Sequence, residues 1–373
     1  MGVRTDPYNA GITWLDEPLT GASTGPLAGR TLVVKDLVDT AGVRTTYGSK
    51  IYADHVPDRH AVVVERALAA GATLVGKANL VEFAWGVLGQ NEWYGTVHNP
   101  VRPGRTTGGS SSGNGAALAA GLCDLAIGTD TGCSVRLPAA ACEIVGLKPR
   151  HGLVPEDGVF PLCPSFDTVG PMARSVADVA TLWSVLAARP VPEPELAGRT
   201  VGILRRAPDL ADGRDTERSD AAEQWVTRLE SLGARVVEAT VPGPAASLWP
   251  VFDHEAARSH AATFPSRAEE YGRAIRAKLE AAQRADPEAV LEGYRALVAW
   301  RQLVPEVDLY VAPCVAIEWP AEDANESEVR LPLSSYMRWV NLLGWAGLAI
   351  GNLQLIAPTD EVVLAAGLAW ERG

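Results

Sequence analysis

The chain has 373 residues, of which 47% are hydrophobic and 21% charged, and its formal net charge is −12. This length is sufficient to bury a sizeable core, and the composition is that of a globular protein rather than a disordered chain. Because phosphate recognition needs a basic surface, the acidic balance argues against nucleic acid as a direct partner and against anionic membranes.

No targeting or membrane-spanning segment is expected. The first nine residues lack the apolar region of a secretory signal, and no apolar run approaches the roughly eighteen residues of a membrane span. The five cysteines are odd in number and include no C-x-x-C pair. This pattern is typical of reduced thiols rather than of disulfides or a zinc site, and it predicts a cytoplasmic protein.

In the first half of the chain, short apolar runs alternate with segments of helical periodicity. The glycine- and serine-rich residues 104–115 predict a loop, and the proline-rich residues 188–198 predict a surface connection. The expected elements are strands at 31–35, 73–76 and 125–128 and helices at 60–70, 79–84, 116–120 and 175–188.

The second half continues this alternation. Strands are expected at 200–204, 234–238, 309–312 and 353–357, and helices at 220–232, within 254–304 and at 335–343. Alternating strands and helices are typical of the α/β class. The sequence therefore predicts a single large domain over residues 1–373, with a mixed β-sheet core covered by helices on both faces.

Two segments rich in glycine and serine are candidates for chemistry. Ser110, Ser111 and Ser112 lie between glycines, and Ser134 follows the residues TDTGC. Such loops let backbone N–H groups converge on a phosphate or an oxyanion. Neither G-x-x-x-x-G-K-[ST] nor G-x-G-x-x-G is present, so an oxyanion is favoured. Taken alone, either segment is also compatible with an ordinary loop.

One motif within the first segment is set aside. Residues 109–113 formally match G-x-S-x-G, the nucleophile elbow of α/β-hydrolases. That elbow requires a hydrophobic strand immediately before it, whereas the preceding residues are Arg105, Thr106 and Thr107. The downstream histidines also lie in no catalytic context, so a Ser-His-Asp triad is not favoured.

Lys35 ends the apolar run TLVVK. A lysine at the end of a strand can extend its amine to the surface. Alternatively, burial can lower its pKa and leave a neutral amine that acts as a base. The local sequence alone leaves both interpretations open.

Several blocks in one order resemble the amidase signature family. GRTLVVKD, RTTGGSSSGNGAALAAG and GTDTGCSVRLPAAA resemble the family's lysine, Gly/Ser and nucleophile blocks, and the resemblance covers residues 29–174. It implies that Ser134 is the nucleophile, that Ser110 is a bridging serine after a cis peptide bond, and that Lys35 is the base. Residues 196–373 resemble the family less and are expected to complete the sheet and the pocket.

The implied mechanism is a proton relay from Ser134 through Ser110 to a neutral Lys35, followed by hydrolysis of an acyl-enzyme. It requires no metal and no organic cofactor. The remaining residues that the resemblance assigns are oxyanion donors at Thr131, Gly132 and Cys133, supporting polar residues at Ser111, Asp130 and Arg136, and substrate contacts at Trp85, Gly86 and Phe160.

The chain departs from the family pattern at several places. Cys133 and Glu143 stand where the family favours glycine, and Thr107 replaces a common proline. If Cys133 required a positive φ, its side chain would strain the oxyanion loop. The family's N-terminal helices are largely absent, and a connection near residues 341–358 is shortened. These features resemble the compact members, including the indoleacetamide hydrolase and malonamidase types.

The favoured function is hydrolysis of a small linear amide to an acid and ammonia or an amine, by a protein that could form a homodimer. Two alternatives stay open. One is a catalytically impaired binding homologue, which the substitution at Cys133 would favour. The other is a component resembling the A subunit of aminoacyl-tRNA amidotransferases, which would require partner chains.

Overall fold

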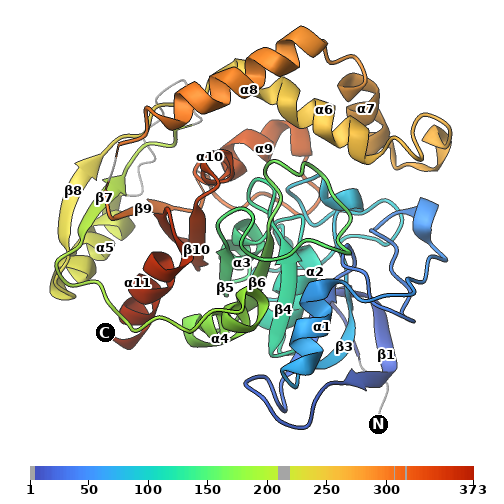
Figure 1. Cartoon of the computed structure of the whole chain (residues 1–373), viewed down its shortest axis with the longest axis horizontal. Coiled ribbons are helices and arrows are strands. Elements are labelled where there is room, and N and C mark those ends of the chain that lie inside the picture. The colour runs from blue at the N-terminus through green and yellow to red at the C-terminus, as the bar shows by residue number, and fades with distance from the viewer. Residues whose placement is uncertain (1–4, 209–218, 306, 316) are drawn as a thin grey trace.

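The computed structural model describes residues 5–208, 219–305, 307–315 and 317–373, and the strands in this part of the chain form one mixed sheet (Figure 1). Their spatial order is β1-β3-β2-β4-β6-β5-β10-β11-β9-β7-β8. The strands are β1 (Gly11–Thr20), β2 (Thr31–Lys35), β3 (Thr73–Ala78), β4 (Leu125–Thr129), β5 (Val145–Lys148), β6 (Val169–Ala173), β7 (Thr200–Leu204), β8 (Arg235–Ala239), β9 (Leu309–Pro313), β10 (Ala346–Ile350) and β11 (Leu353–Ala357).

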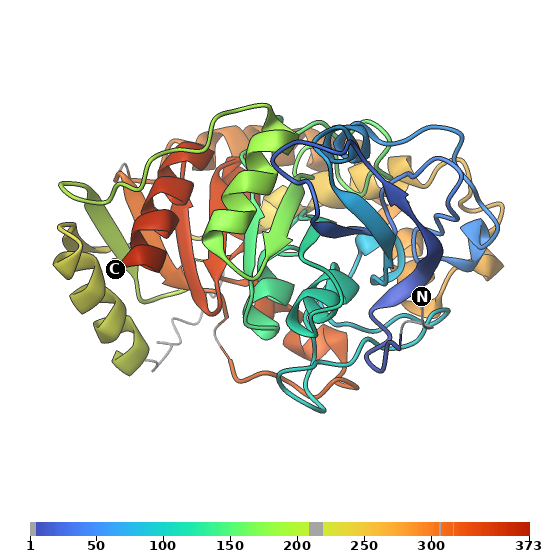
Figure 2. The same cartoon turned by 90° about the horizontal axis from the view of Figure 1, so that it is seen from below.

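Helices cover both faces of this sheet, as expected for the α/β class. They are α1 (Val62–Ala69), α2 (Ser112–Ala119), α3 (Arg136–Ala141), α4 (Val176–Ala187), α5 (Ser219–Ser231), α6 (Trp249–Ser259), α7 (Arg273–Ala282), α8 (Pro287–Arg301), α9 (Glu326–Ser334), α10 (Arg338–Leu343) and α11 (Asp360–Arg372). Helices α4 and α11 pack on one face, and α2 and α3 on the other (Figure 2). Helices α6, α7 and α8 form an arch beyond one end of the sheet (Figure 1).

The direction of the strands determines on which side of the sheet the candidate catalytic residues lie. Strand β2 lies between β3 and β4 and is parallel to both. Successive side chains of a strand point to opposite faces. Leu32 and Val34 belong to the core beneath α1 and α4, whereas Val33 packs with residues of α2 and α3. Lys35, two residues after Val33, therefore points toward the side on which α2 begins.

Several elements differ from the expectation. Strands β1, β5, β6 and β10 and helices α3, α9 and α11 are not predicted, since most of them are short or contain glycine or proline. Helix α2 begins four residues before the predicted start because its glycines serve close packing rather than a loop. A Cβ atom at Gly113 would lie 2.2 Å from the carbonyl oxygen of Ala10. The predicted helical stretch 254–304 divides into three helices, α6 to α8.

The connection between β10 and β11 is a short hairpin. Ile350 pairs with Leu353 in an antiparallel register, so only two residues join the strands, and one of them, Gly351, has a φ of 53°. This agrees with the shortened connection seen in the sequence. None of the helices in the described ranges is long and apolar enough to cross a membrane. All five cysteines are buried and none forms a disulfide.

Candidate active site

The predicted base and the two predicted serines meet at the carboxyl ends of parallel strands. Lys35 is the last residue of β2, and Thr129 is the last residue of β4. Ser134 follows β4 in a loop, and Ser110 lies just before α2. Because β2 and β4 are parallel, their carboxyl ends lie at the same edge of the sheet, where α/β proteins commonly bind ligands.

Lys35 is fully buried and its amine contacts two hydroxyl groups. Nζ lies 2.7 Å from Ser110 Oγ and 2.7 Å from Thr129 Oγ1. Burial lowers the pKa of Lys35 to about 7, and the negative charges of Asp130 and Asp167 oppose this shift only in part. A substantial fraction of the amine is therefore neutral near pH 7 and able to accept a proton.

The peptide bond between Gly109 and Ser110 is cis, as the family resemblance implies. The next residue, Ser111, joins the two glycine- and serine-rich segments. Its N–H donates to the carbonyl of Ser134 at 3.2 Å, and its hydroxyl donates to the carbonyl of Thr129 at 3.3 Å. Ser134 lines the pocket described below, and no side chain in the described part of the molecule hydrogen-bonds to its hydroxyl.

The loop before Ser134 lines that pocket and carries backbone donors without a protein partner in the described ranges. Within the described residues, the backbone N–H groups of 131–134 have no hydrogen-bond partner. The Thr131 side chain holds the loop by donating to Asp167 Oδ1 at 2.5 Å. Buried N–H groups are otherwise nearly always paired, so this cluster is a candidate site for a ligand oxygen.

The two residues that replace family glycines behave differently. Cys133 does not adopt a positive φ, so its side chain introduces no left-handed strain into the loop. Burial raises the pKa of the Cys133 thiol to about 12, which keeps it protonated. Glu143 does have a left-handed φ of 54°, which accounts for the family's preference for glycine there. Its exposed carboxylate pairs with Arg102.

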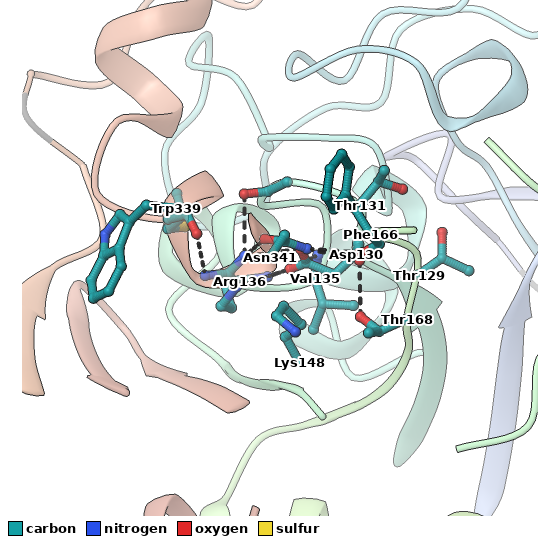
Figure 3. A network of polar contacts seen from close by, with 12 residues as sticks. Thr129, Asp130, Thr131, Val135, Arg136, Lys148, Phe166, Thr168, Trp339 and Asn341 are labelled. Atoms are coloured by element: carbon teal, nitrogen blue, oxygen red, sulfur yellow. Dashed lines mark hydrogen bonds and ion pairs between the residues drawn. The ribbon is translucent and has the colours of Figure 1, made fainter. Parts of the chain in front are cut away.

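A buried ion pair between Asp130 and Arg136 holds the same loop in place (Figure 3). Arg136 donates from Nε to Asp130 Oδ2 at 3.0 Å and from Nη2 to Asp130 Oδ1 at 2.9 Å. Burial by itself raises the pKa of Asp130, but the Arg136 charge and its hydrogen bonds outweigh burial and hold the pKa at about 2. The guanidinium also donates to Met337 O, Gln354 Oε1 and Asn341 Oδ1.

Three residues of this site were not singled out from the sequence. Asn341 on α10 donates to both the carbonyl and the carboxylate of Asp130. Gln354 on β11 accepts from Arg136, and Thr129 accepts from Lys35. Thr129 belongs to a quoted family block and could have been found there. Asn341 and Gln354 lie in the divergent half. The only signal in the sequence is that each is a polar residue within an apolar run, which indicates a buried structural role.

Ser134 lines a cavity of about 370 Å³ between the loop of residues 131–134 and helices α6, α7, α9 and α10. Trp85 and Gly86 line it, as expected from the sequence. Phe160 does not. It lines a second cavity of about 90 Å³, and its ring packs against Tyr47 and Phe83.

The cavity combines aromatic and charged side chains. The aromatic members are Trp85, Phe166, Trp249 and Phe252, and the charged members are Asp253, Lys278, Arg330 and Arg338. Most of these residues belong to the divergent half and were not predicted. Across the described residues, no group of three His, Cys, Asp or Glu side chains is arranged to hold a metal ion.

Comparisons with known proteins place this site in a family. The model of the family described as Amidase matches residues 13–356, and the chain belongs to this family. A solved structure of an amidase shares 30% identity with a TM-score of 0.82, covering 93% of this chain and 84% of the other. The 6-aminohexanoate cyclic dimer hydrolase bound to its substrate shares 25% identity with a TM-score of 0.83, over 94% and 86%.

Among curated proteins, the chain resembles the A subunit of the glutamyl-tRNA(Gln) amidotransferase of Natronomonas pharaonis. The two are 42% identical over 253 residues, which cover 63% of this chain and 59% of that relative. The A subunit of the Symbiobacterium thermophilum amidotransferase is 44% identical over 58% of this chain and 48% of its own length. The chain thus spans about half to three fifths of the curated relatives it matches.

Proposed function

We propose that the protein is an amidase that cleaves a carboxamide through an acyl-enzyme on Ser134. The observation that carries this proposal is the cluster of unpaired N–H groups at 131–134, which lies beside the Ser134 hydroxyl in a substrate-sized cavity. Donors of this kind stabilise the oxyanion of acyl transfer, each contributing roughly 2.7–4 kcal/mol. The contact between Lys35 and Ser110 supports the accompanying roles of base and bridging serine.

In the proposed reaction, neutral Lys35 takes the proton of Ser110 while Ser110 takes the proton of Ser134. Ser134 Oγ then attacks the carbonyl carbon, and the N–H groups bind the oxygen that becomes negative. The C–N bond breaks as the leaving amine receives a proton from Ser110, which regains one from Lys35. Water then attacks the ester, transfers its proton along the same relay and releases the acid and Ser134.

The cavity favours an aromatic acyl group over a short dicarboxylic one, because two of its three cations, Lys278 and Arg330, are paired with Glu326. Four aromatic side chains line it, and rings of this kind pack well against flat apolar groups. Between the two compact types that the sequence resembles, this favours an arylacetamide of the indoleacetamide kind over malonamate. A cavity of about 370 Å³ is of the size that encloses such molecules.

The test is release of ammonia from phenylacetamide, indole-3-acetamide and malonamate by purified protein. We expect turnover of the aryl amides to exceed that of malonamate, and we expect Ser134→Ala to abolish it. Ser231→Ala is the matched control, because Ser231 is exposed and its hydroxyl donates to the carbonyl of Arg228 within α5. A Ser134→Ala variant as active as wild type would overturn the proposal.

The identity to the A subunits of amidotransferases favours a second candidate, a component that releases ammonia within a complex. That function requires partner chains, whereas the proposed amidase acts alone. Purification from the native host at low salt separates the two. Stoichiometric co-purification of partner chains, together with no amide hydrolysis by the isolated chain, would favour the second candidate.

A further inference from the structure

One wall of the cavity is built from a backbone segment in an unfavourable conformation. Phe83 and Ala84 have φ values of 49° and 59°, and they lie immediately before the cavity residues Trp85 and Gly86. Residues other than glycine rarely adopt a positive φ, and two in succession persist only where surrounding contacts fix them. The position of Trp85 therefore depends on groups outside the segment.

Lys278, on α7, supplies such contacts. Its Nζ donates to the carbonyl oxygen of Trp85 at 2.6 Å and lies 5.9 Å from the centre of the indole ring. The same amine forms an ion pair with Glu326 on α9 at 3.0 Å. Both side chains are about four-fifths buried, so this pair is shielded from solvent more than an ordinary surface pair.

Glu326 restrains the segment from a second direction. A Cβ atom at Gly86 would lie 2.6 Å from Glu326 Oε2 and 2.7 Å from Val81 Cγ1, so residue 86 is in close contact with the carboxylate. Arg330, one turn along α9, holds that carboxylate at 3.3 Å. The strained segment is thus fixed by charged groups from two helices that are far away in the sequence.

We propose that Lys278 is a positioning residue that determines acyl specificity by linking the carbonyl of Trp85 to the carboxylate of Glu326, which lies against Gly86. The inference rests on the proposed amidase activity, because specificity is read from amide turnover. Lys278 makes the wall rigid, and an acyl group large enough to reach Trp85 packs against a preformed surface. A small acyl group that does not reach Trp85 gains nothing from this contact.

The charge state of Lys278 gives a further consequence. Burial and the charge of Arg330 together lower the pKa of its amine to about 8, and Glu326 opposes this shift. Asp253 on α6 faces the same cavity. As the pH rises through about 8, the amine loses its charge and with it the ion pair and the attraction to the indole ring.

The experiment compares phenylacetamide with propionamide in wild type, Lys278→Met and Lys278→Arg. We expect Lys278→Met to raise KM for phenylacetamide about tenfold with little change in kcat, and to leave propionamide kcat/KM within about threefold. Lys278→Arg should restore much of the loss. Arg273→Gln is the control, since this side chain on the same helix is 94% exposed.

A second measurement does not need turnover. Hydrogen exchange of a peptide covering 83–87 should become faster in Lys278→Met and, to a smaller degree, in Glu326→Gln, because local opening depends on these contacts. Glu326→Gln keeps the side-chain shape, so it also guards against a failure of the first variant to fold. Hydrogen exchange tests the contacts of Lys278 and Glu326 with this segment even if wild type hydrolyses no amide. That outcome would count against the proposed function alone.

Three results would overturn the inference. One is a ratio of the KM for phenylacetamide to the KM for propionamide that does not change in Lys278→Met, together with unchanged hydrogen exchange of residues 83–87 in Lys278→Met and Glu326→Gln. Another is an equal loss of kcat for both substrates, which would show a general effect on the site. The third is a loss confined to an anionic amide such as succinamate, which would show that Lys278 binds substrate charge directly.

Discussion

Lys35 holds its amine between two hydroxyl groups in a fully buried position, and this placement sets the pH range of the proposed reaction. The neutral amine is the form that accepts a proton, and its pKa is lowered to about 7 by burial, with Asp130 and Asp167 opposing. We therefore predict that kcat/KM for a small amide rises with pH through about 7 and then levels. The measurement is a pH profile of initial rates with propionamide.

The control for this profile is Lys35→Met, which keeps the length of the side chain but cannot accept a proton. It should lose activity over the whole pH range. A profile that is flat between pH 5 and about 9, or a Lys35→Met variant with wild-type rates, would contradict the role of Lys35 as base.

Replacing Cys133 tests the alternative that the protein is a catalytically impaired homologue. Its φ is not left-handed and its thiol is buried, so glycine at this position relieves no strain. We predict that Cys133→Gly lowers the free energy of unfolding by about 1–3 kcal/mol, through lost burial and greater chain entropy, and leaves kcat within about threefold. Kinetics and urea unfolding measure both. An increase in kcat beyond about tenfold would show that cysteine impairs the oxyanion loop.

At the scale of elements, the loop between β4 and α3 is held by the buried ion pair of Asp130 and Arg136. Side chains of α10 and β11 form hydrogen bonds to this pair. Removing one member leaves an uncompensated charge in the interior. We predict that Asp130→Asn lowers the free energy of unfolding by roughly 3–5 kcal/mol and slows amide turnover by displacing the oxyanion donors. Urea unfolding and kinetics give both values.

A matched control is Asp178→Asn, which weakens a partly exposed pair with Arg30 at 2.8 Å. Pairs of this kind contribute about 1 kcal/mol or less, so this variant should resemble wild type in both measurements. Equal losses of stability in Asp130→Asn and Asp178→Asn would contradict the role of the buried pair as an anchor.

The elements differ in how well the sequence predicts them. Strands at 31–35, 200–204 and 353–357 have the predicted bounds because each is a short apolar run with clear limits. Strand β6 reads VGPMA, and its glycine and proline conceal a strand that the neighbouring β4 and β5 stabilise. Helix α3 begins two residues after Ser134 and has too few residues to show a helical period.

At the scale of the whole molecule, the candidate catalytic set was predictable, whereas most of the pocket was not. Lys35, Ser110 and Ser134 lie in blocks whose order resembles the family, and the structure brings Lys35 within 2.7 Å of Ser110. The pocket is built largely by helices α6, α7, α9 and α10. Their contacts depend on how α6, α7 and α8 are arranged beyond one end of the sheet, which no local pattern encodes (Figure 1).

The most direct test of the central claim is the intact mass of the protein after treatment with a serine-reactive fluorophosphonate. We predict one adduct on wild type, formed faster as the pH rises through about 7, and none on Ser134→Ala. Such a result would establish Ser134 as an activated nucleophile independently of the substrate. Absence of an adduct on folded wild type, or an adduct that persists in Ser134→Ala, would contradict the proposed mechanism.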